Sequence, residues 1–157
     1  MKKSDEPGKT RVAAYVRIGG SGQCDQILEV HTRYYQDWIG RNPEWEFAGV
    51  YADIGPEMKD RPELKHLIYD CEARRVGLIV TKNTSRISRS IHEIIKIAFK
   101  LRYLKRPVGI YFETENMNTL SDESFLLLTL MEIIAIEESK HKNDALPYIY
   151  TQDQVKR

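Results

Sequence analysis

The sequence has few of the features that mark secreted, metal-binding or membrane proteins. It holds two well-separated cysteines, Cys24 and Cys71, and its charged first eight residues are followed by no apolar stretch. This pattern predicts no secretory signal and is typical of reduced thiols in the cytoplasm. No cysteine or histidine pair has metal-ligand spacing, which argues against a metal site. The longest apolar run, residues 125–131, is far below the ~18 residues that a membrane span needs.

A strong net charge is also missing. The 24 Lys and Arg nearly balance the 23 Asp and Glu, which leaves a formal net charge of +1. If nucleic acid is the partner, a local arginine cluster must bind it, because the overall charge does not. The length of 157 residues and the 41% hydrophobic content are those of one soluble globular domain.

Strand and helix patterns alternate along the chain. After a polar lead-in over residues 1–10, short apolar or β-branched runs predict strands at 11–18, 45–53, 77–81 and 108–112. Helical periodicity predicts helices over 25–41, from Pro62 onward, and over 91–104. The alternation predicts an α/β fold with a mostly parallel central sheet and helices on both faces, in three layers.

The last predicted helix, from Ser121 to about Lys142, is apolar around most of its circumference. Such a surface needs cover, from the domain's own sheet and from a second subunit, although a central core helix explains it equally well. From Asn143 to Arg157 the sequence is polar around Pro147, and we expect a loosely ordered tail.

Charged and hydroxyl side chains follow the predicted strands. Ligands bind at the carboxyl ends of the strands in open parallel sheets. The residues expected on this rim are Arg17, Asp53, Arg61, Lys82, Ser85, Arg86 and Arg89. Guanidinium groups match phosphate, so the cluster suggests binding of, or chemistry on, a phosphate group. The alternative is that these arginines are separate solvated charges, paired with Asp53, Asp60 and Glu63.

Several of these residues occur in a familiar order. Tyr15-Val16-Arg17, Asp53, Arg61-Pro62, Ser85-Arg86-Ile87-Ser88-Arg89 and Glu137-Glu138-Ser139 resemble the serine recombinase (resolvase/invertase) catalytic domain. The resemblance is closest to the large serine recombinases of conjugative transposons and covers residues 11–142. It implies a resolvase-like domain with a long C-terminal helix.

The resemblance also implies a reaction. In this family a serine hydroxyl attacks a DNA phosphate, which gives a 5′-phosphoserine link and a free 3′-hydroxyl, without a metal or other cofactor. By position, Arg17, Arg61, Arg86 and Arg89 would surround the phosphate, and Asp53 would orient an arginine or help to move protons. We further expect Gln23, Lys82 and Ser85 to contact DNA phosphates. Phe125, Leu128, Met131 and Ile134 would form the interface of a homodimer, which becomes a tetramer in the active synaptic complex.

One departure concerns the nucleophile. Gly19 stands where the family has its serine, and the chain is inactive as written unless Ser21, two residues on, takes that role. A second departure is His31, where the family usually has glutamine. We expect weak DNA binding by residues 1–157 alone. Two other interpretations remain: a non-catalytic α/β dimerisation or regulatory module derived from a recombinase, and a small-molecule phosphate binder.

Overall fold

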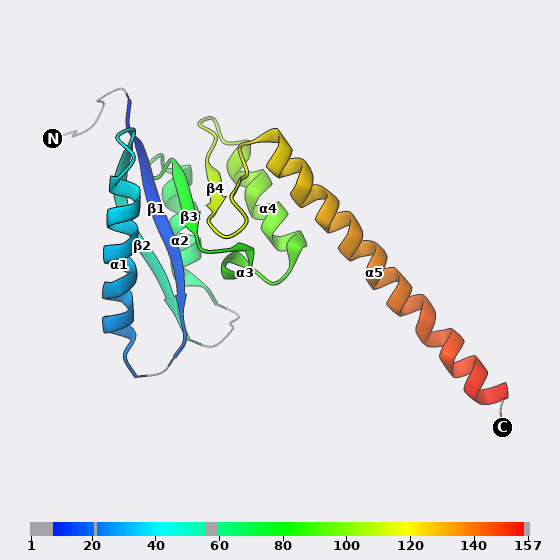
Figure 1. The fold of residues 1–157 in the computed structure, drawn as a ribbon. Helices are drawn as coiled ribbons and strands as arrows, with labels where there is room; N and C mark the ends of the chain where they lie inside the picture. Colours follow the sequence, from blue (N-terminus) through cyan, green and yellow to red (C-terminus); the bar gives the residue numbers. More distant parts are fainter. Residues whose placement is uncertain (1–7, 21, 56–59, 156–157) are drawn as a thin grey trace.

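A mostly parallel sheet organises the domain (Figure 1). The computed structural model describes residues 8–20, 22–55 and 60–155, with side chains up to residue 141. Its strands are β1 (Thr10–Ile18), β2 (Trp45–Ile54), β3 (Leu78–Thr81), β4 (Gly109–Phe112) and β5 (Met117–Asn118), in the order β2-β1-β3-β4-β5. All neighbours pair in parallel except β5, which is antiparallel to β4. The predicted α/β fold is confirmed.

Helices cover both faces of this sheet. On one face α1 (Cys24–Gly40) packs through Tyr35 and Ile39, and on the other lie α2 (Pro62–Glu72) and α4 (Ile91–Arg102). Successive β1 side chains point to opposite faces, so Val16 packs toward α1 whereas Tyr15 packs toward α2 and α4. A one-turn helix, α3 (Thr84–Ile87), follows β3.

The C-terminal helix α5 (Asp122–Val155) extends away from the domain as a long rod (Figure 1). Its backbone is helical as far as Val155, whereas the sequence predicted a helix to about Lys142 and a loosely ordered tail from Asn143. Pro147 removes one backbone donor, but lengthening an existing helix requires no new nucleus, and the helix passes this residue. No helix of the described residues is long and apolar enough to cross a membrane.

The domain covers only the start of α5. Leu128 is fully buried and Phe125 packs beside it against the core, with α4 rather than the sheet as the main neighbour. Leu128, which was predicted in a subunit interface, is enclosed by its own domain and offers no exposed surface. Met131 and Ile134, also predicted there, are exposed. The exposed apolar face of α5 comprises Leu126, Leu127, Leu130, Met131, Ile133, Ile134 and Ile136.

Candidate functional site

The strand order creates a crevice at the carboxyl edge of the sheet. Strand β1 has β2 as its neighbour on one side and β3 on the other. The chain therefore passes first from β1 to β2 and then back across β1 to β3. The loops that leave β1 and β3 therefore diverge, and in sheets with this order ligands bind at that point. A pocket of about 310 Å³ lies there, lined by the end of β1, the segment after β3 and the middle of α1.

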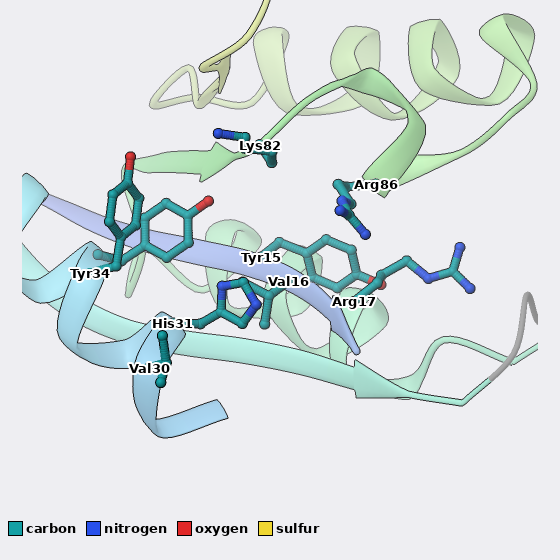
Figure 2. Close-up of a pocket in the computed structure, with 9 residues that line it drawn as sticks. Tyr15, Val16, Arg17, Val30, His31, Tyr34, Lys82 and Arg86 are labelled. Atoms are coloured by element: carbon teal, nitrogen blue, oxygen red, sulfur yellow. The ribbon is translucent and has the colours of Figure 1, made fainter. Parts of the chain in front are cut away.

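Three cationic side chains line the pocket. Arg17 comes from the end of β1, and Lys82 and Arg86 come from the segment after β3 (Figure 2). The Thr81 hydroxyl donates to the Tyr15 carbonyl over 2.9 Å, which ties the ends of the two strands together. No acidic side chain is among the described residues that line the pocket. This arrangement can bind an anion such as a phosphate group.

The opposite wall of the pocket is apolar and aromatic. On the α1 side it is formed by Val30, His31, Tyr34 and Tyr35, and Tyr15 and Val16 of β1 complete the lining. The four α1 residues recur at helical spacing, so they share one face of that helix. Burial and, to a smaller degree, the Arg86 charge lower the pKa of His31, which favours the neutral imidazole. Sequence reasoning did not assign Val30 or Tyr34 to the site, although their spacing around His31 was visible.

The other two predicted arginines do not line this pocket. Arg61 lies beside it, where its guanidinium donates to the Ile87 carbonyl and pairs with Glu93, and its side chain is only 16% exposed. Glu93 also accepts from the Ser88 hydroxyl over 2.5 Å. Arg61 therefore stabilises the position of α3, the helix that carries Arg86. Arg89 is exposed on the connection between α3 and α4.

Asp53 is buried at the end of β2. Its carboxylate accepts from the Tyr15 hydroxyl over 2.7 Å and from the backbone N–H groups of Glu63 and Leu64 over 2.9 and 3.1 Å. It thus satisfies two free donors in the first turn of α2, where Pro62 stands. Burial and then the hydrogen bond to Asp53 raise the pKa of Tyr15 well above its ordinary value. These partners indicate that Asp53 anchors β2, β1 and α2.

The position expected to hold the nucleophile is exposed. Gly19 follows the end of β1, two residues after Arg17, and a Cβ atom built there would meet nothing within 4 Å. The backbone therefore leaves room for a serine. Ser21 lies outside the described residues.

Two predicted phosphate contacts lie away from the pocket wall. Gln23 is exposed just before α1, in a separate hollow lined by residues 22–26. The Ser85 hydroxyl donates to the Asn83 side chain over 2.6 Å. Among the described residues, no three His, Cys, Asp or Glu side chains are grouped so that they could hold a metal ion.

Comparison with known families decides the class of this fold and site. The family model described as "Resolvase, N terminal domain" matches residues 12–146. The chain belongs to the resolvase family. It is a domain of the serine recombinase catalytic type, as the arrangement Tyr15-Val16-Arg17 and Ser85–Arg89 predicted.

Solved structures share the fold of this resolvase domain. The N-terminal catalytic domain of TP901-1 integrase is 24% identical, with a TM-score of 0.61 over 83% of this chain and 97% of that one. A resolvase family site-specific recombinase from Streptococcus pneumoniae is 16% identical, with a TM-score of 0.64 over 93% and 99%. The catalytic domain of ISC1926 TnpA, an IS607-like serine recombinase, is 18% identical, with a TM-score of 0.50 over 80% and 79%. No curated protein matches the sequence.

Proposed function

We propose that this resolvase domain binds a DNA phosphate in the pocket between β1 and β3 and does not cleave DNA as written, because residue 19 is glycine. One observation carries the proposal. Arg17, Lys82 and Arg86 line the same pocket, in the crevice where the loops that leave β1 and β3 diverge. These side chains come from segments about 65 residues apart in the sequence, which the parallel pairing of β1 and β3 brings together.

The electrostatics of the pocket suit a phosphate. Arg17 is half-buried, so part of its charge faces a medium of lower dielectric than water, whereas Arg86 and Lys82 remain exposed. A guanidinium can donate two hydrogen bonds to two phosphate oxygens, and Lys adds a compact charge. These donors would also stabilise the extra charge that develops when a nucleophile attacks the phosphorus.

The missing element is the attacking hydroxyl. A serine at position 19 would lose its proton, form a bond from Oγ to phosphorus and displace the 3′ oxygen, which leaves with a proton as a free hydroxyl. A glycine has no group that can do this. The open space around the Gly19 Cα supports restoration of the reaction by a single substitution.

The experiment compares the unchanged protein with Gly19→Ser on a nicked suicide DNA substrate that carries the cognate site. We expect a covalent protein–DNA adduct on a denaturing gel with Gly19→Ser and none with the unchanged protein. Gly40→Ser is the matched control, since it also replaces an exposed glycine with open space around it but lies at the far end of α1. An adduct from the unchanged protein that is lost in Ser21→Ala would instead identify Ser21 as the nucleophile. No adduct from any of these proteins would favour a non-catalytic interaction module.

We also propose that the exposed apolar face of α5 is the surface for homodimer formation, and for a tetramer in a synaptic complex. Seven large apolar side chains, each between 39% and 59% exposed, lie on this helix outside its contact with the domain. An apolar patch of this extent on a protruding helix favours burial against another protein surface. A second copy offers an identical helix, which gives a self-complementary interface.

A further inference from the structure

The phosphate-binding residues leave half of the pocket between β1 and β3 without a role. We propose that its aromatic wall takes up an unpaired nucleobase of the DNA strand whose phosphate is bound by Arg17, Lys82 and Arg86. The inference rests on the proposed function, and it adds a base subsite to the phosphate subsite.

The size of the pocket supports a ligand larger than a phosphate. Its volume of about 310 Å³ is at the lower end of the ~300–1,000 Å³ typical of small-ligand sites. A single phosphate group occupies only a small part of such a space. A nucleotide, with its base, sugar and phosphate, suits the available volume.

The wall facing the cations can contact a flat apolar ring. His31 and Tyr34 lie on the α1 side, whereas Lys82 and Arg86 lie on the opposite side (Figure 2). Tyr34 is 46% exposed as a residue, and its ring packs edge-on against the buried Tyr35 ring, with 5.0 Å between the ring centres. Tyr35 thus holds Tyr34 in place and leaves ring surface free for a ligand.

The polar end of Tyr34 is already held, and His31 is favoured in its neutral form. The Tyr34 hydroxyl donates to the Glu113 carboxylate over 2.9 Å, which orients the ring. The lowered pKa of His31 favours a neutral imidazole near neutral pH. A neutral imidazole can stack on a base or exchange one hydrogen bond with its edge, without placing another charge in the apolar wall.

The combination of aromatic rings with adjacent cations distinguishes among ligands. Single-stranded nucleic acids are bound by cationic grooves along the backbone and by aromatic side chains on which the bases stack. An apolar peptide would leave the three cations without a partner, and an inorganic anion would leave the aromatic wall empty. A nucleotide satisfies both halves. A base inside a duplex cannot reach the wall, so the strand must be unpaired at that position.

The test compares two ligands that differ only in the base. The full chain is titrated with thymidine 5′-monophosphate and with 2-deoxyribose 5-phosphate, with binding followed by NMR chemical-shift changes. Stacking of a base on an aromatic side chain predicts about tenfold tighter binding of the nucleotide. Tyr34→Ala should remove this difference and leave the affinity for the sugar phosphate unchanged, whereas Tyr34→Phe, which retains the ring, should preserve it.

A matched control separates a local effect from a general one. Tyr69→Ala also removes an exposed tyrosine from a helix, α2, but outside the pocket, and should change neither affinity. If the sugar phosphate binds as tightly as the nucleotide and Arg86→Ala weakens both equally, the base subsite is wrong and the phosphate site stands. If neither ligand binds, or Arg86→Ala has no effect, the phosphate site of the proposed function is itself wrong.

A second measurement identifies the source of the base. Affinity for a single-stranded oligothymidylate should fall about tenfold in Tyr34→Ala, whereas affinity for a duplex of the same length should be unchanged. If Tyr34→Ala weakens binding of the mononucleotide but not of the single strand, the pocket takes free nucleotides, and the assignment to DNA is overturned.

Discussion

At the scale of single residues, Asp70 on α2 connects the helix to its neighbours through one buried carboxylate. It is 5% exposed and accepts from the Tyr51 hydroxyl of β2 over 2.5 Å and from the Arg75 guanidinium over 3.1 Å. Burial alone would raise the pKa of Asp70, but these hydrogen bonds and the nearby His66 outweigh it, and the pKa falls below its ordinary value of 3.8. The ionised form is therefore favoured by folding.

We predict that Asp70→Asn lowers the free energy of unfolding at pH 7 by about 1–3 kcal/mol, since it weakens hydrogen bonds to a charged acceptor in a buried place. A pKa that is lower in the folded state gives stability above the unfolded pKa, and this is lost as the pH falls through the folded value. The difference between the two proteins should therefore shrink below about pH 4. Urea unfolding at neutral and acidic pH measures it. Asp37→Asn, at an exposed ion pair on α1, should stay within about 0.5 kcal/mol of the unchanged protein. An equal loss at both pH values would contradict this account.

Asp53 shows what the sequence could and could not predict at this scale. Its place at the end of a strand followed from the alternating pattern of residues 45–53. Its partners did not, because they depend on how closely α2 approaches the end of β2 and on the direction of the Tyr15 side chain. The same applies to Arg61: its position after a strand was predicted, but its engagement with Glu93 requires the fold of the segment after β3.

At the scale of elements, α5 has an inner and an outer side. Leu128 is fully buried in the domain, whereas Leu130 is 47% exposed two residues later. We predict that Leu128→Ala lowers the free energy of unfolding by about 2–5 kcal/mol because it leaves a cavity in the core. Leu130→Ala should leave the stability of the monomer nearly unchanged and weaken self-association. Denaturant unfolding and sedimentation velocity measure the two effects separately. Self-association that is unaffected by Leu130→Ala would count against the exposed apolar face as the dimer surface.

Element prediction succeeded where the periodic signal was long or strongly apolar. The buried runs at β1 and β3 and the amphipathic α1, α2 and α4 were visible from their spacing. The one-turn helix α3 and the two-residue β5 were missed, because four and two residues are too few to establish a period. The end of α5 was missed for a different reason, since a proline inside a helix weakens it without always ending it.

At the scale of the whole molecule, charge is almost balanced, and much of it is paired on the surface away from the pocket. Arg33 with Glu29 and Arg41 with Asp37 are exposed pairs on α1. The sequence alone supplied the net charge of +1, but only the fold brings Arg17, Lys82 and Arg86 to one place. DNA affinity should therefore come from a few cations and be weak.

We predict a Kd for duplex DNA that is micromolar or weaker at physiological salt, as for non-specific binding. If three cations contact phosphates, the logarithm of the association constant should fall against the logarithm of salt concentration with a slope of about −2.7, at roughly 0.9 per neutralised phosphate. Arg86→Ala should reduce the slope to about −1.8. Arg33→Ala, which removes an arginine that already pairs with Glu29 outside the pocket, should leave it unchanged. Fluorescence anisotropy over a series of salt concentrations measures the slope. Nanomolar binding, or equal slopes for both variants, would mean that DNA is bound by a surface other than the pocket between β1 and β3.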